Sequence, residues 1–363
     1  MKPVDRVLTA LNLEEPDEIP IGEQAYDVRK VAEVLGKPIN SVPSSNIDKR
    51  TAAIKTNVEI LSLFIEKLDL DLVPVIPSPP TGGPKKRWID DETWVDEWGA
   101  KYRFRDGIDW YVGPALRHIR EINDLDVPDP HAPGVTDEAE ILVKRFKGEK
   151  ALVGVLPGPK MPYLGRGIDG YNIDLFRNFA WAKRFMDMTT RYNVELGKRL
   201  IEAGVDLICM TGDVAYRGGP IVSLRHFKEV FVPAIEEPTR EFHKFGVPVI
   251  KHTDGYLEPI LEDLVATGID GLQSIEPAAG MDIGKVKARY GDRICLWGNI
   301  DLSYTLSLGT EREVSEEVER CISAAAPGGG FILSSSNSYS SAAKFENFLA
   351  MVKAGRKYGE YPR

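Results

Sequence analysis

The sequence has few of the residues and segments that define several classes of protein. Its 363 residues include three cysteines, Cys209, Cys295 and Cys321, whose spacing fits neither a zinc motif nor a disulfide framework. No apolar run approaches the ~20 residues of a membrane-spanning helix. Residues 1–17 carry charges throughout, unlike a signal peptide. We therefore expect a cytoplasmic protein that contains no disulfide.

The charge balance excludes further classes of partner. The net charge is −9, and the basic patches, such as Lys85-Lys86-Arg87, are short. Nucleic acids and anionic membranes bind positively charged surfaces, so neither is an expected partner. The segment Gly165-Arg166-Gly167 is expected to be a loop that could cover a ligand. It lacks the Lys-Ser/Thr pair of a phosphate-binding loop, which argues against nucleotide binding.

The regular feature of the sequence is an alternation of short apolar strands with amphipathic helices. This alternation implies parallel strands joined by right-handed crossovers, and eight such units predict an α/β fold, a single (β/α)8 TIM barrel over residues 1–363. Two of the helices are predicted over residues 174–184 and 189–203. The eight strands are predicted to start near Ile19, Asp71, Leu152, Val205, Val247, Gly271, Ile294 and Gly330.

Two segments lie outside this alternation. Residues 1–13 place Val4, Val7 and Leu11 on one face and predict an N-terminal helical extension. Residues 85–115 alternate tryptophan, tyrosine and phenylalanine with charged residues, and we expect antiparallel strands or a long excursion from the barrel. This aromatic-rich segment could cover a pocket or form a small hydrophobic core of its own, and the sequence leaves both open.

Polar residues follow most of the predicted strands. The stretch VPVIKHTDGY is strand-like from Val247 and ends with His252 and Asp254. In a barrel such strand ends converge on one mouth, where active sites lie. Aspartate and asparagine also cap helices, so a capping role is equally open for Asp301 and Asn337. The residues expected at the mouth are Glu23, Asp213, His252, Asp254, Glu276, Asn299, Asp301 and Asn337.

So many carboxylates around one histidine cannot all remain charged and unpaired in one cavity. Three arrangements would resolve this: a divalent metal, a cationic substrate, or a network of shared protons with raised carboxyl pKa values. His252 with Asp254 and Glu276 would suit zinc, or another divalent ion, that keeps an open position for substrate.

Several stretches resemble the uroporphyrinogen decarboxylase superfamily, which also contains corrinoid- and coenzyme M-dependent methyltransferases. The resemblance covers nearly the whole chain and implies the barrel fold, and its known homodimers make a homodimer one expectation here. The stretches that carry it are IPIGEQA, DEWGAKYRF, RGGPIVS from Arg217, KHTDGYLEPILEDLVATGIDGLQSIEP from Lys251, YGDRICLWGNID from Tyr290 and PGGGFILSSSNS from Pro327.

Departures from the superfamily patterns distinguish among its activities. Uroporphyrinogen decarboxylases carry Arg-Gln-Ala-Gly-Arg in the first strand's loop, where it binds the porphyrinogen carboxylates. Here the matching stretch runs from Glu23 to Asp27, and these two acids would repel a polyanionic tetrapyrrole. The zinc thiol-methyltransferases use a His-x-Cys pair and a late cysteine, but this chain has His252-Thr253-Asp254 and, near the late position, Asn337. Oxygen and nitrogen ligands make a more Lewis-acidic metal, which suits an ether or phenolic oxygen as leaving group.

The resemblance and these departures imply a corrinoid-dependent methyltransferase of the O-demethylase type. A corrinoid (cobalamin) on a partner protein would supply Co(I) and take the methyl group from a small methoxylated, aromatic substrate. His252, with Asp254 or Glu276, would hold a metal such as zinc or donate a proton, and Glu23 and Asp213 would complete the catalytic site. The residues expected to bind substrate are Arg217, Tyr216, Asn299, Asn337 and Trp98.

Two alternatives stay open at this point. One is a cofactor-free decarboxylase of a small carboxylic acid, in which Arg166, Arg217 or Lys251 would bind the carboxylate. The other is a non-catalytic protein that binds a corrinoid or another small ligand.

Overall fold

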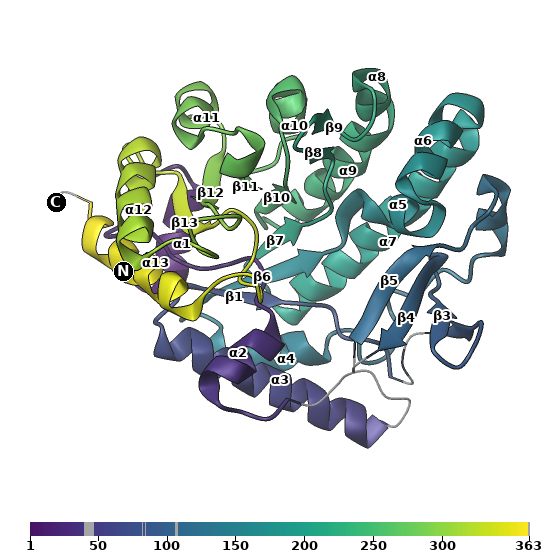
Figure 1. Ribbon diagram of the computed structural model, residues 1–363, viewed down its shortest axis with the longest axis horizontal. Coiled ribbons are helices and arrows are strands. Elements are labelled where there is room, and N and C mark those ends of the chain that lie inside the picture. Colours follow the sequence, from purple (N-terminus) through teal and green to yellow (C-terminus); the bar gives the residue numbers. More distant parts are fainter. Residues whose placement is uncertain (40–46, 82, 84, 106–107, 362–363) are drawn as a thin grey trace.

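The centre of the molecule is a curled sheet of parallel strands surrounded by helices (Figure 1). The computed structural model describes residues 1–39, 47–81, 83, 85–105 and 108–361. All strand pairs in this sheet are parallel, as the alternation of strands and helices predicts. The seven strands, in spatial order, are β1 (Leu72–Val75), β6 (Ala151–Leu156), β7 (Leu207–Met210), β10 (Val249–Thr253), β11 (Gly271–Ser274), β12 (Cys295–Ile300) and β13 (Phe331–Ser335).

The predicted first strand is an extended segment without a regular ladder, which corrects the expected count of eight strands. It fills the gap between β13 and β1, because Leu333 N–H donates to Pro20 O at 2.9 Å and Asp71 N–H donates to Ile21 O at 2.8 Å. Proline has no N–H to donate, and Ile21 N–H donates to the Asp71 side chain at 2.7 Å instead of a backbone carbonyl. The fold is therefore a TIM-barrel-like α/β fold whose eighth position is held by isolated bridges.

Helices cover the outside of the sheet, and α1 (Pro3–Leu11) packs against its inner residues. Alternate strand residues form an inner apolar cluster, and α1 packs Val4, Val7 and Leu11 against it, as expected of the N-terminal helical extension. The helices are α1 (Pro3–Leu11), α2 (Val28–Leu35), α3 (Ile47–Lys67), α4 (Asp137–Phe146), α5 (Met161–Arg166), α6 (Ile168–Arg177), α7 (Phe179–Ala203), α8 (Leu224–His226), α9 (Val232–His243), α10 (Leu261–Ala266), α11 (Ile283–Tyr290), α12 (Glu311–Ala325) and α13 (Phe345–Tyr358).

The helices between β6 and β7 differ from the prediction. The segment expected as a Gly-rich loop forms the end of α5, and the predicted helices over 174–184 and 189–203 are replaced by α6 and a continuous α7. Asn178 leaves the helical conformation between them, and its amide donates to Asp174 at 2.8 Å. Thr189 and Thr190 do not break α7, because both hydroxyls donate back to Met186 O.

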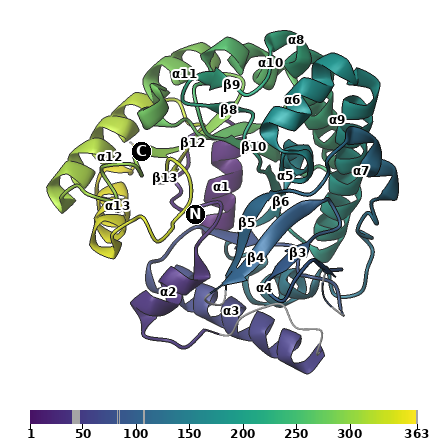
Figure 2. The same ribbon diagram turned by 45° about the vertical axis from the view of Figure 1, so that its right-hand side comes forward.

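The aromatic-rich segment forms a separate four-stranded antiparallel sheet beside the barrel (Figure 2). Its strands are β2 (Arg87–Trp88), β3 (Thr93–Val95), β4 (Ala100–Arg105) and β5 (Ile108–Pro114). Trp94 stacks on Tyr102 with ring centroids 4.8 Å apart, which makes a local hydrophobic core. Trp98, which is buried, lines the main cavity. The sheet thus serves both of the roles that the sequence leaves open.

Two expectations from composition can be compared with the structure. The three cysteines are free and buried. Among the helices of the described residues, none is long and apolar enough to cross a membrane.

Candidate active site at the carboxyl ends of the strands

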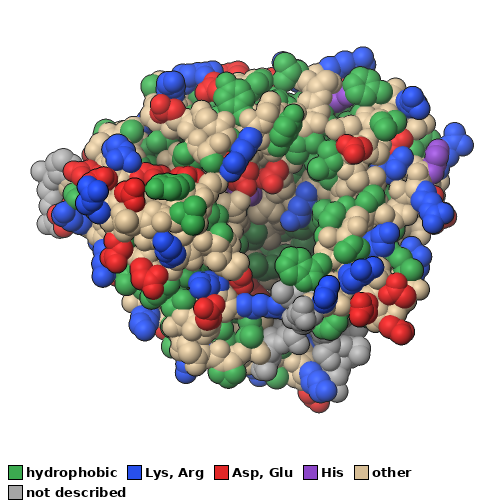
Figure 3. Space-filling model, in the orientation of Figure 1, with side chains coloured by type: hydrophobic (Ala, Val, Ile, Leu, Met, Phe, Trp, Pro, Cys, Tyr) green, Lys and Arg blue, Asp and Glu red, His purple; other side chains and the backbone are tan. Residues whose placement is uncertain are grey.

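The largest cavity described here opens at the carboxyl ends of the strands and has a volume of about 1170 Å³. Figure 3 shows it as a hollow into which both acidic and basic side chains reach. Asp213, His252, Asp254 and Asn337 lie on its wall, so the sequence places these four correctly in one cavity. Much of the remaining wall is apolar and comes from the barrel, from α5 and from the aromatic-rich segment; it includes Leu156, Leu164, Ile168, Ile221 and Trp98.

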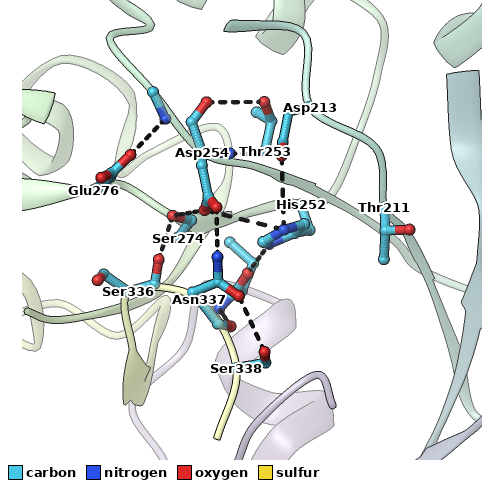
Figure 4. Close-up of polar contacts among 12 residues, drawn as sticks. Thr211, Asp213, His252, Thr253, Asp254, Ser274, Glu276, Ser336, Asn337 and Ser338 are labelled. Atoms are coloured by element: carbon cyan, nitrogen blue, oxygen red, sulfur yellow. Dashed lines mark hydrogen bonds and ion pairs between the residues drawn. The ribbon is translucent and has the colours of Figure 1, made fainter. Parts of the chain in front are cut away.

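Asp213, His252 and Asp254 form a cluster with the spacing of a metal site. Each offers one ligand atom, and these atoms lie within 4.8 Å of one another. His252 Nε2 is 3.8 Å from Asp213 Oδ1 and 4.0 Å from Asp254 Oδ1 (Figure 4). We call these three residues the acidic cluster.

The tautomer of His252 is fixed by Gln273, which lies opposite it in the register of β10 and β11. Gln273 Nε2 donates to Asn337 O at 2.9 Å, and a backbone carbonyl can only accept, so the amide nitrogen must face it. The amide oxygen therefore faces His252 and accepts a hydrogen bond from Nδ1–H. In the neutral imidazole the lone pair is then on Nε2, which faces the two carboxylates, and this is the arrangement a metal-ligating histidine needs.

Asp254 is held in place by side chains from two other strand ends. Its Oδ1 lies 2.6 Å from the hydroxyl of Ser274, and its Oδ2 accepts from the amide of Asn337. Burial raises the pKa of Asp254, and the charge of Asp213 raises it further, whereas His252 lowers it. Asn337 therefore positions a carboxylate of the cluster and does not cap a helix.

Asp213 lies on a tight turn beneath which a lysine is buried. Gly212 adopts a left-handed conformation with φ of 93°, and Asp213 Oδ1 accepts from Asp254 N–H at 3.0 Å. Lys251 is fully buried and donates to Gly212 O at 2.7 Å and to His252 O at 2.5 Å. Burial lowers the pKa of Lys251 to about 8. This lysine holds the ends of β7 and β10 together and is unavailable to a substrate carboxylate.

Glu276, named with His252 and Asp254 as a candidate ligand, makes other contacts. Its Oε2 accepts from Gly255 N–H at 2.9 Å, and its Oε1 pairs with Arg217 at 3.2 Å. Asp213 takes the third place in the acidic cluster. Asp301 caps a turn by accepting from Ser303 N–H at 2.9 Å, one of the two roles left open for it.

The remaining predicted site residues are distributed around and below the cavity. Glu23 is fully buried, and its carboxylate accepts from the backbone and the hydroxyl of Ser335, both at 2.8 Å. Burial raises the pKa of Glu23 to about 7. Asn299 is also buried and donates to Ile275 O at 2.9 Å. Tyr216 is exposed, and none of these three residues lines the cavity, unlike Trp98.

Sequence reasoning missed two residues of the site, Gln273 and Lys160. Gln273 lies within the apolar run of β11, before the strand end, and only the register with β10 reveals its contact with His252. Lys160 follows a proline-rich turn and gives no pattern, yet it lines the cavity. The cations that were expected to bind a carboxylate are engaged elsewhere: Arg166 pairs with Asp174 at 2.7 Å and Arg217 with Glu276.

The acidic cluster fits a divalent cation. Within the described ranges, the ion-pair partner of both Asp213 and Asp254 is His252, and neither carboxylate pairs with a lysine or an arginine. One imidazole nitrogen and two carboxylate oxygens suit zinc or a harder divalent ion, and no thiolate is present among them.

The fold and the site together define an enzyme of the α/β-barrel class, with its candidate metal ligands at the carboxyl ends of the strands. Residues 93–358 match the uroporphyrinogen decarboxylase (URO-D) family, and the chain belongs to this family.

Its relatives carry two kinds of activity. Uroporphyrinogen decarboxylase of Alkalilimnicola ehrlichii is 27% identical over 278 residues, which cover 71% of this chain and 72% of the relative. Methylcobamide:CoM methyltransferase MtaA of Methanosarcina barkeri is 24% identical over 231 residues, which cover 62% of this chain and 64% of that protein. A methyltransferase from Methanosarcina mazei has the same fold, with a TM-score of 0.74, 18% identity and 99% of both chains covered.

Proposed function

We propose that this protein is a corrinoid-dependent methyltransferase that demethylates a small methoxylated, aromatic compound. The observation that carries the proposal is the acidic cluster, in which one imidazole and two carboxylates within 4.8 Å face an otherwise largely apolar cavity. A relative named for methyl transfer from a methylcobamide supports the choice of chemistry. The methyl acceptor is the Co(I) of a corrinoid protein, and a cytoplasmic location fits these partners.

The reaction breaks the bond between the methyl carbon and the ether oxygen and forms a bond between carbon and cobalt. The oxygen keeps the electron pair of the broken bond and takes up one proton, and Co(I) supplies the pair for the new bond. The protein must therefore stabilise negative charge on one oxygen and deliver a proton to it.

The residues of the cluster divide this work. A bound divalent cation would supply Lewis acidity at the ether oxygen, and Asp213, His252 and Asp254 would hold it. Gln273 keeps the Nδ1 proton of His252 in place, so that Nε2 faces the cavity. In the alternative without a bound cation, Asp254, whose pKa is raised by burial, would hold the proton that the departing oxygen needs.

The other predicted residues act around this centre. Trp98 and the apolar wall receive the aromatic ring and exclude water from the cavity. Tyr216 and Arg217 are exposed near the mouth, where Arg217 contacts Glu276, and they meet the substrate or the corrinoid protein. Glu23 supports the end of β13 from below through Ser335.

An anaerobic assay tests the proposal. Purified protein is mixed with cob(I)alamin and a panel of methoxylated aromatic compounds, and methylcobalamin formation is followed by absorbance. We expect product with some ethers, and we expect His252→Ala to abolish it. His243→Ala is the matched control, because His243 lies on α9 and pairs with Asp270, away from the cavity. Full activity in the His252→Ala protein would refute the assignment, and carbon dioxide release without methyl transfer would favour decarboxylation.

A further inference from the structure

Lys160 is a cation that faces the cavity, and no described residue pairs with it. It directly precedes α5 and packs against the turn that carries Asp213, since a Cβ at Gly212 would lie 3.1 Å from Lys160 Cβ. Among the described residues, none forms a hydrogen bond or an ion pair with its ammonium group. Burial lowers the pKa of Lys160, while the charge of Asp213 raises it. The ammonium group is thus partly desolvated beside the acidic cluster and available to a ligand.

Tyr163 adds an unpartnered hydroxyl to the same wall of the cavity. It follows Lys160 by three residues along the same helical turn, and both residues line the cavity. Its hydroxyl is buried, and none of the residues that the structure describes is its hydrogen-bond partner. Its ring is already fixed by stacking on Phe231, with centroids 5.6 Å apart and 16° between the planes. Because Tyr163 also lines the cavity, its unused hydroxyl can take a partner from a ligand bound there.

The chemistry of these two groups selects an anionic oxygen. An ammonium group only donates hydrogen bonds, and the tyrosine hydroxyl can donate as well. No arginine lines the cavity among the described residues, and phosphate recognition usually relies on arginine forks or several backbone N–H groups. Asp213 and Asp254 on the same wall would repel a molecule with several negative charges. A single carboxylate on an apolar body satisfies all of these conditions.

We propose that Lys160 and Tyr163 form a subsite for the carboxylate of the substrate, which makes the substrate a methoxylated aromatic acid. Only the methoxyl group of this substrate rests on the proposed function. The carboxylate is inferred from Lys160 and Tyr163, which lie outside the acidic cluster. The ring lies against the apolar wall formed by Leu164, Ile168 and Ile221. The carboxylate then fixes which edge of the ring faces the cluster.

Binding measurements test the subsite without any turnover. The probes are the three isomers of methoxybenzoate and the corresponding methoxybenzamides, which differ in charge but hardly in shape. Dissociation constants are measured by calorimetry for the wild-type protein, Lys160→Met, Lys160→Arg and Tyr163→Phe. The matched control is Lys244→Met, since Lys244 pairs with Glu241 on the surface.

We expect at least one methoxybenzoate to bind, and Lys160→Met to weaken that binding by ~10- to 100-fold, as for loss of a hydrogen bond to a charged group. Tyr163→Phe should weaken it by ~3- to 10-fold. Lys160→Arg should restore much of the affinity. The amides keep a carbonyl acceptor but carry no charge, so they should lose much less affinity than the acids in Lys160→Met. The subsite is refuted if no methoxybenzoate binds, or if acids and amides lose affinity equally in Lys160→Met.

Failure of the subsite and failure of the proposed function give different results. If methoxybenzoate binding depends on Lys160 but no methylcobalamin forms, the methyltransferase proposal fails and the subsite stands. If methoxybenzamides are demethylated as well as the acids and Lys160→Met leaves KM unchanged, the subsite fails and the methyltransferase proposal stands.

Discussion

Replacing Gln273 by methionine should weaken metal binding by the acidic cluster while leaving the barrel folded. Methionine has a similar volume, so the buried position is not emptied. The change removes the acceptor of the His252 Nδ1–H and the donor to Asn337 O. A buried donor left without a partner costs about 1–3 kcal/mol. The imidazole then escapes this cost by rotating, which takes Nε2 away from the two carboxylates, or by changing its tautomer, which places the proton on Nε2. Either change removes the Nε2 lone pair from the metal position.

The expected magnitude is a ~10- to 100-fold loss of affinity for zinc, which is typical when the outer partner of a ligating histidine is removed. Affinity is measured by competition with a chromophoric chelator, and circular dichroism checks the fold. Asn299→Leu is the matched control, because it removes a buried amide that donates to Ile275 O without contacting His252. We expect this variant to lose stability but to keep its metal affinity.

The reasoning would be refuted by a folded Gln273→Met protein with wild-type zinc affinity. Such a result would mean that Gln273 does not orient His252, or that zinc does not bind through this histidine. A loss of affinity as large in Asn299→Leu would point to general destabilisation of the strand ends instead of a defined contact.

Two further predictions concern charges near the site. In the folded protein the pKa of Glu23 is raised to about 7 from 4.5. Between these two pH values the folded protein therefore binds more protons than the unfolded chain. The free energy of unfolding falls as pH rises through this window. Glu23→Gln should remove up to about 3 kcal/mol of this pH dependence, as measured by urea denaturation from pH 4.5 to 7.5. If the free energy of unfolding changes with pH in the variant as it does in the wild type, the prediction is wrong. Arg217→Ala should change the free energy of unfolding by less than about 1 kcal/mol, because the Arg217 side chain is largely exposed. A larger loss in thermal denaturation would show that its contact with Glu276 holds the strand end.

Much of the fold follows from the periodicity of the sequence. The seven strands were predictable because each is a short buried run that is followed by an amphipathic helix. The edge near Ile21 was not, because its pairing depends on a side chain of Asp71 that takes the place of a backbone acceptor. The extent of α7 could not be predicted either, because Thr189 and Thr190 disfavour a helix. In the structure both hydroxyls donate to the carbonyl of Met186 one turn earlier, and the helix continues.

The candidate site was predictable only where the residues end strands. His252, Asp254 and Asp213 meet because parallel strands end at the same edge of a barrel, a rule that the sequence alone can apply. The separation of Glu276 from this group required coordinates, since it depends on which way a side chain turns from its strand end. The role of Gln273 required the register of β10 and β11.

The closure of the barrel has a consequence for how the chain is made. Ile21 pairs with Leu333, so the segment around Ile21 waits until all the residues between the two have been synthesised. At ~5–20 residues per second, this wait is on the order of tens of seconds. During that time α1 and the segment around Ile21 lack β13, one of the strands against which they pack. Newly made chains therefore present an unpaired apolar edge to the cell until β13 has been synthesised, and chains that stop before β13 cannot close the barrel.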